Sequence, residues 1–156
     1  MAEQTHDHGA QSLNRLSVSA TLHCMTGCVL GEVVGLVIAT ALGWGNAPSI
    51  ALAVVLAFLF GYTLTTIPLF RAGLTVAAVV PIALATDTVS ITIMEAIDNV
   101  FMALYPGAMD AYIDELLFWG PMLGGFVIAF PFAFLANRWL LARGKGHALV
   151  HQYHSH

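Results

Sequence analysis

Four long apolar runs alternate with short polar breaks along the chain. Each run exceeds the roughly 18 residues that an α-helix needs to cross the hydrocarbon core of a bilayer. The breaks hold residues that end helices, among them Gly43, Gly73 and Pro106. The pattern predicts an all-α, polytopic membrane protein whose four transmembrane helices cover residues of about 19–44, 47–70, 74–105 and 116–142.

A polar stretch flanks the apolar part at each end. Residues 1–18 are predicted to form an N-terminal tail, and they lack the basic and then apolar regions of a cleavable signal peptide. Residues 143–156 are predicted to form a C-terminal tail, so residues 19–142 make up one membrane domain. Histidine-rich tails can chelate metal ions, although scattered histidines are also common in tails without that role. The tail histidines are His6, His8, His147, His151, His154 and His156.

Composition narrows the class of protein. The chain has 156 residues, of which 58% are hydrophobic and only 9% are charged. A soluble globular domain has a charged fraction near about 25%, so that class is excluded. The net charge of −4 argues against a nucleic-acid-binding surface, and two cysteines are too few for a disulfide scaffold. We therefore expect the surface of the protein to contact the lipid bilayer.

The five basic residues predict the orientation in the membrane. Arg15 precedes the first run, Arg71 lies between the second and third, and the other three occur in residues 138–145, at the end of the fourth run and just after it. The two remaining connections contain no Lys or Arg, and the longer of them is acidic. Short loops rich in Lys and Arg stay in the cytoplasm. We therefore expect both termini on the cytoplasmic side.

Prolines lie inside the third and fourth runs. The third run is too long to cross a core of about 30 Å, at 1.5 Å per residue, unless it tilts, bends or protrudes. Pro81 is the predicted bend, because proline removes one backbone hydrogen bond. Pro121 and Pro131 are expected to bend the fourth run in the same way.

A row of glycines runs along the first apolar segment at i, i+4 spacing. Gly27, Gly31 and Gly35 form the kind of small-residue face that lets another helix backbone approach closely. We interpret this row as a packing face, either within the chain or between two copies of it.

A second row, Cys24, Cys28 and Glu32, lies about 100° away around the same helix. With His23 and Met25 these residues combine thiol, imidazole, thioether and carboxylate, a set that suits Cu(I), zinc or iron. They are the predicted metal site. Buried cysteines also occur as small packing residues, and a lone histidine can lie at the membrane interface. Glu32 favours the site, because an acid near mid-depth in a membrane is by default functional.

The third apolar run contains three acids and an amide, Asp87, Glu95, Asp98 and Asn99. Asp87 and Asp98 fall on nearly the same helical face, and Glu95 and Asn99 fall on an adjacent one. Hydroxyl side chains on this helix are explained by hydrogen bonds that hold helices together. Carboxylates without a basic partner instead take up protons or bind a cation. These four residues are therefore the predicted ion or proton pathway.

Counting residues from the start of each run predicts how the two polar helices align. With starts near Ser19 and Leu74, both Glu32 and Asp87 fall near the midplane of the membrane. The cysteines then lie on the cytoplasmic side of that level, and the later acids of the third run lie on the outer side. The order indicates a cation route that ends at the acidic outer loop.

Two segments carry a resemblance to a known family. Residues 23–32, HCMTGCVLGE, and residues 86–99, TDTVSITIMEAIDN, resemble a prokaryotic integral-membrane family of the domain of unknown function 4396 type. The resemblance extends over residues of about 19–142 and implies a small multi-pass protein of the prokaryotic plasma membrane. It implies no activity, so function has to be argued from the residues.

These observations favour a small transporter or channel for a transition-metal ion, with Cu(I) expected first and zinc or Fe(II) next. Four helices enclose little volume, so a homo-oligomer is expected, and no catalytic residue is predicted. A membrane-embedded metalloenzyme is an alternative, but di-iron bundles use Glu-x-x-His pairs, and the spacing from Glu95 to Asp98 lacks the histidine. A metal-binding or assembly subunit of a larger membrane complex is a further alternative.

Overall fold

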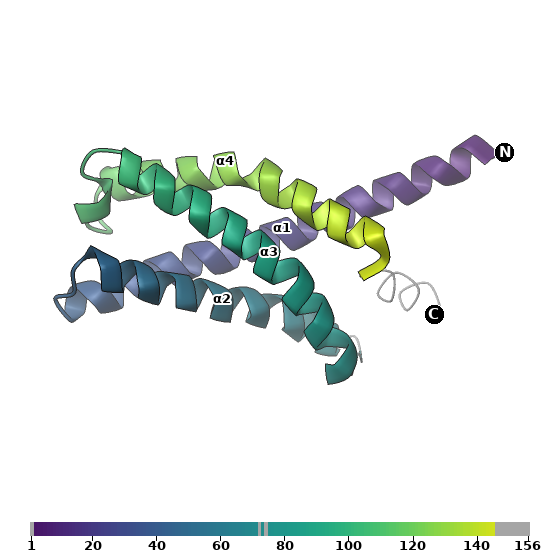
Figure 1. The fold of residues 1–156 in the computed structure, drawn as a ribbon, viewed down its shortest axis with the longest axis horizontal. Coiled ribbons are helices and arrows are strands. Elements are labelled where there is room, and N and C mark those ends of the chain that lie inside the picture. The colour runs from purple at the N-terminus through teal and green to yellow at the C-terminus, as the bar shows by residue number, and fades with distance from the viewer. Residues whose placement is uncertain (1, 72, 74, 146–156) are drawn as a thin grey trace.

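The computed structural model of the chain describes residues 2–71, 73 and 75–145, which form helices and no strand (Figure 1). A 3-10 turn, η1 (Ala108–Asp110), precedes the last long helix, and a π-helical turn, η2 (Leu141–Lys145), follows it. The long helices are α1 (Ala2–Ala41), α2 (Asn46–Arg71), α3 (Val76–Leu104) and α4 (Leu116–Leu140).

Each long helix contains a segment that is long and apolar enough to cross a membrane. In the described chain these four segments are Leu13–Ala41, Asn46–Ile67, Val79–Leu104 and Leu116–Arg143. The predicted all-α fold with four membrane-length helices is thus confirmed. The helix α1 begins well before its membrane segment, and its first turns extend beyond the bundle (Figure 1).

Glycine ends α1 at the break that the sequence predicts. Gly43 has a φ of 65°, a left-handed conformation that strains any residue with a side chain. Its N–H donates to Thr40 O at 3.1 Å, and the N–H of Trp44 donates to Ala39 O at 2.9 Å. This is the Schellman arrangement, which satisfies the last carbonyl groups of a helix.

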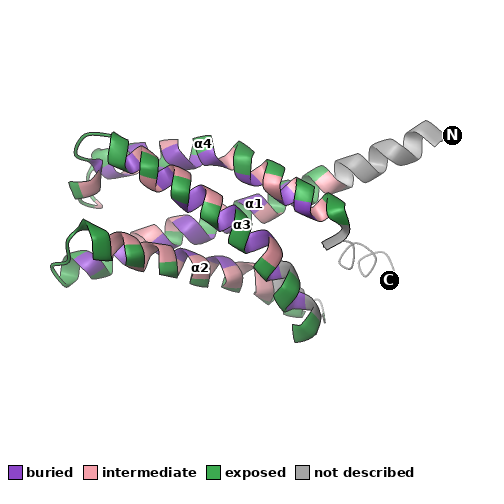
Figure 2. Ribbon diagram, viewed as in Figure 1, coloured by how far each residue is buried: buried purple, intermediate pink, exposed green. Residues whose placement is uncertain are grey.

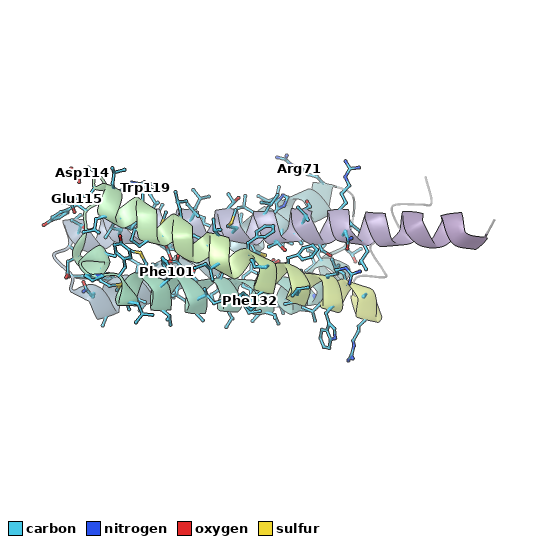
Figure 3. The ribbon with its side chains drawn as sticks, turned by 90° about the horizontal axis from the view of Figure 1, so that it is seen from above. Arg71, Phe101, Asp114, Glu115, Trp119 and Phe132 are labelled. Atoms are coloured by element: carbon cyan, nitrogen blue, oxygen red, sulfur yellow. The ribbon has the colours of Figure 1, made fainter. Side chains whose placement is uncertain are left out.

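The helices form two hairpins, α1–α2 and α3–α4, that pack against each other (Figure 1). The α1–α2 and α3–α4 connections lie at one end of the bundle, which we call the loop end. The start of α1, the α2–α3 connection and the end of α4 lie at the other, the tail end (Figure 1). Figure 3 shows that this separates charge, because Asp114 and Glu115 lie at the loop end and Arg71 at the tail end.

The helices α1 and α3 form the centre of the bundle, since each packs against the three other long helices. The buried residues follow the faces that α1, α3 and α4 turn toward one another, whereas α2 is mostly half-buried or exposed (Figure 2). Most of the apolar surface of α2 is therefore free to contact lipid.

The glycine row of α1 packs directly on the backbone of α2. A Cβ atom added at Gly27 would lie only 2.6 Å from the nearest backbone atoms of α2, so the substitution would force the helices apart. The row is covered within the chain and is not a free face for a second copy. The contacting pairs are Gly27 with Gly61, Gly31 with Ala57, and Gly35 with Ala53.

The substitution Gly31→Ala is expected to destabilise the bundle, because the added methyl would overlap the backbone of Ala57. Overpacking of this kind costs about 1–3 kcal/mol, and it should lower the melting temperature measured by circular dichroism in detergent. Gly45→Ala is the control, because a Cβ atom there meets nothing within 4 Å. Equal melting temperatures for the two variants would contradict the packing.

Candidate functional site

The polar faces of α1 and α3 meet in a row of paired thiol and carboxyl groups. In the first pair, the Cys24 thiol donates to Asp87 Oδ1, with 3.4 Å between sulfur and oxygen. Both side chains are buried, at 0% and 1% exposure. The hydroxyl of Thr86, on α3 itself, donates to the same carboxyl oxygen at 3.3 Å. Donors from α1 and from its own helix therefore hold Asp87 in place.

The second pair, Cys28 and Glu95, lies one turn of α1 nearer the loop end. The two side chains are neighbours, and both are buried. Asn99 holds the acid from its own helix, because its Nδ2 lies 2.9 Å from Glu95 O and 3.4 Å from Glu95 Oε2. Like the first pair, the second pair therefore combines a thiol with a carboxyl group.

The third pair consists of two acids, Glu32 and Asp98, whose side chains are neighbours. Their carboxyl groups can form a hydrogen bond only when one of them carries a proton, because an ionised carboxyl group only accepts. Gly125 of α4 makes room for the pair, since a Cβ atom there would overlap Asp98 Oδ1 and lie 3.0 Å from Asp98 Cα. The backbone of α4 therefore closes directly over Asp98.

These pairs correct the predicted depths. Glu32 does not lie at the level of Asp87; it lies two turns of α1 beyond Cys24, which is the residue that meets Asp87. The helix α1 begins at Ala2, well before its apolar run, so the start of that run does not determine how far α1 is displaced along α3.

Each pair leaves a carboxyl oxygen without a hydrogen-bond partner. These buried atoms are Asp87 Oδ2, Glu95 Oε1 and Asp98 Oδ1. Burying such an oxygen is costly unless it binds a proton, a cation or another donor. The sequence has no Lys or Arg in residues 16–70 or 72–137, so the membrane segments between those bounds supply no Lys or Arg partner.

The row opens into a cavity of about 450 Å³ at the loop end. Glu32 and Asn99 form part of its wall, and Asp110 of η1 lines it nearer the loops, where it accepts a hydrogen bond from Asn46 at 3.1 Å. The cavity gives Glu32 access to the loop end. Aromatic and thioether side chains complete the wall: Trp44, Tyr112, Phe118, Met102 and Met109.

At the tail end the row meets a buried amide, that of Asn137 on α4. Its Nδ2 donates to Thr21 Oγ1 at 3.0 Å and to Ser90 Oγ at 3.2 Å. Ser90 also lies beside Cys24, so the amide is close to the first pair. Sequence reasoning did not identify Asn137, although an amide in an otherwise apolar run was a signal.

The predicted metal ligands of α1 divide between different environments. Cys24 and Cys28 are buried in the row, and Glu32 is half-buried at the cavity. His23 is exposed, with its Nδ1 2.7 Å from the backbone oxygen four residues earlier, and Met25 packs against the apolar core. Within the described part of the chain, no three His, Cys, Asp or Glu side chains are grouped so as to hold one metal ion.

The polar side chains of α3 also divide. Asp87, Glu95 and Asp98 all lie in the row, and Asn99 lies between Glu95 and the cavity. Thr88 instead is exposed, and its hydroxyl lies 2.7 Å from the Tyr62 hydroxyl of α2. The candidate histidines of the two tails are not among the residues whose side chains the structure describes.

The fold and the row define a polytopic membrane protein with acids and thiols buried along its centre. A family model, the domain of unknown function DUF4396, matches residues 14–146, so the chain belongs to this family. The resemblance found in the sequence is thereby confirmed. Comparisons with curated proteins and with solved structures found no match.

The substitution Gly125→Ala is expected to push Asp98 out of its pair, because the added methyl overlaps the carboxyl oxygen. The cost should be about 1–3 kcal/mol, measured as unfolding free energy in mixed micelles. In a background that carries Asp98→Ala most of this cost should disappear, since the overlapping group is gone.

Gly120→Ala in the same helix is the matched control, because its added Cβ atom meets nothing within 4 Å. An unfolding free energy for Gly125→Ala equal to that of the control, or a cost independent of Asp98, would show that α4 does not close over the acid.

Proposed function

We propose that this protein carries a transition-metal cation across the membrane, with the row of paired thiol and carboxyl groups as its path. The main support for this proposal is that three pairs follow one another along the bundle, from a buried amide at one end to an open cavity at the other. A polar core that only holds helices together would satisfy its buried atoms. Here every pair keeps an unpartnered carboxyl oxygen.

The number of ligands in each pair favours passage of an ion over storage. A stable zinc site uses three or four protein ligands, whereas conduction needs sites that release the ion readily to the next one. Cys28 and Glu95 offer two side chains, and so does the pair on either side of them. This arrangement supports a transporter better than it supports a metalloenzyme.

The thiols indicate the class of ion. Thiolate is a soft ligand that selects Cu(I) and also binds zinc and iron. A thiol loses its proton when its sulfur binds a metal, and each thiol here has a carboxyl partner that can take the proton. At Cys24 the S–H bond breaks, an O–H bond forms on Asp87, and the sulfur binds the ion. We expect Cu(I) first, then zinc or Fe(II).

We propose that the tail end faces the cytoplasm of a prokaryotic plasma membrane. The basic residues belong to segments at the tail end and the acidic connection lies at the loop end, and short basic loops stay in the cytoplasm. The cavity at Glu32 then faces outward. In a homo-oligomer the copies would meet on other surfaces than the glycine row, such as the exposed face of α2.

Uptake by proteoliposomes tests the path. The double substitution Cys24→Ala/Cys28→Ala, and Glu32→Gln alone, are each expected to lower uptake of Cu(I) roughly tenfold or more, because ligands of the path are lost. Thr26→Ala is the control, since Thr26 is exposed on the same helix. Elemental analysis of detergent-purified protein, prepared without a metal-affinity column, gives a second readout that should fall in the same variants.

Two results would overturn the metal path. One is a wild-type protein that takes up none of Cu(I), zinc and Fe(II). The other is uptake that stays at the wild-type rate in both the double cysteine variant and Glu32→Gln.

Proton movement is a second candidate, which the Glu32–Asp98 pair favours because two neighbouring carboxyl groups can share a proton. Proteoliposomes with a pH-sensitive dye and no added metal separate the two functions. A proton pathway predicts flux that Glu32→Gln abolishes and that the double cysteine variant retains. Loss of proton flux in the cysteine variant would contradict it.

A further inference from the structure

Asn137 ties the three polar helices together where the row reaches the tail end. Its side chain is 0% exposed. From α4 it reaches both α1 and α3, with Nδ2 3.0 Å from Thr21 Oγ1 and 3.2 Å from Ser90 Oγ. A single amide therefore joins all three helices beside the first thiol of the row.

The Thr21 hydroxyl determines which way this amide faces. It donates to Ser17 O at 2.7 Å, so toward Asn137 it can only accept. The amide nitrogen must face Thr21 and Ser90, and Oδ1 is left buried without a hydrogen-bond partner. An unpaired buried amide oxygen is costly. Asn137 Oδ1 is thus an unused hydrogen-bond acceptor at the tail end of the row. The unpartnered carboxyl oxygens are unused acceptors within the row.

The contacts of Asn137 reach the first pair through Ser90. The Ser90 hydroxyl accepts from Asn137 and lies beside the Cys24 thiol. Cys24 in turn donates to Asp87. Asn137 is therefore separated by one side chain, Ser90, from the thiol that donates to Asp87.

The two ends of the row differ. At the loop end, Glu32 lines a cavity of about 450 Å³. At the tail end, Ser17, Thr21 and Asn137 are each 0% exposed. A cation that enters from the cavity can leave at the tail end only if these contacts open.

We propose that Asn137 is the gate at the tail end of the row. It is a positioning residue that seals Cys24 while it holds Thr21 and Ser90, and it opens the row when it releases them. Its free amide oxygen then accepts the departing cation. This inference rests on the proposed cation path and names the place where the ion leaves it.

The two native cysteines report on the gate, because the chain contains no others. Cys28→Ser leaves Cys24 as the single thiol, and Cys24→Ser leaves Cys28. Asn137→Ala is added to each background, and sealed vesicles are treated at the tail end with a membrane-impermeant cationic methanethiosulfonate. Cys24 should react roughly tenfold faster or more, because the closed state loses two buried hydrogen bonds. Cys28, one turn deeper, should keep its rate.

Two further variants separate gating from general damage. Thr21→Val keeps the volume of the side chain and removes only one of the two acceptors of Asn137. It should therefore raise the labelling rate of Cys24 by a smaller factor than Asn137→Ala does. Leu135→Ala, at an exposed position two residues from Asn137, should leave both rates unchanged. An unchanged Cys24 rate in Asn137→Ala, or equal acceleration of both cysteines from both sides of the membrane, would overturn the gate.

The labelling experiment uses no metal, so its result does not depend on whether the protein transports metal. Faster Cys24 labelling in a protein that takes up no metal would support the gate and refute the metal path. Metal uptake by the wild type with no change in Cys24 labelling would support the path and refute the gate.

Discussion

Carboxyl groups are costly in hydrocarbon, by roughly 2.5–3.5 kcal/mol for an acid at the centre of a helix on insertion scales. The membrane-spanning segments of this chain contain four of them. Apolar side chains do not drive helices together in lipid, because lipid tails are equally apolar. The need to turn these acids inward therefore determines which faces of α1 and α3 meet, and the row of pairs follows from it.

Small residues let the helices come close enough to satisfy that need. The glycine row of α1 lies on the backbone of α2, and the cysteine row is about 100° away around α1. Packing one row on α2 leaves the other facing α3. Gly125 completes the enclosure, because α4 can close over Asp98 only where a side chain is absent.

The enclosed row has different ends, and this asymmetry connects the fold to the proposed function. The acidic end opens into a cavity, whereas an amide that joins three helices closes the other end. A path for a cation needs weak successive sites and a barrier that can open. In the path that we propose, the pairs are these sites and Asn137 is the barrier.

The sequence alone determined the four apolar helices, their glycine-containing ends, the separation of charge and the family, because each depends on composition or on contacts within a few residues. Helical periodicity also identified the polar faces of α1 and α3. Only the tertiary structure decided that Cys24 meets Asp87, that His23 lies outside the row and that Asn137 joins it. Periodicity fixes directions around one helix, whereas the axial shift and rotation between two helices depend on packing. Counting residues along each run therefore put Glu32 level with Asp87, whereas in the structure Glu32 lies beside Asp98.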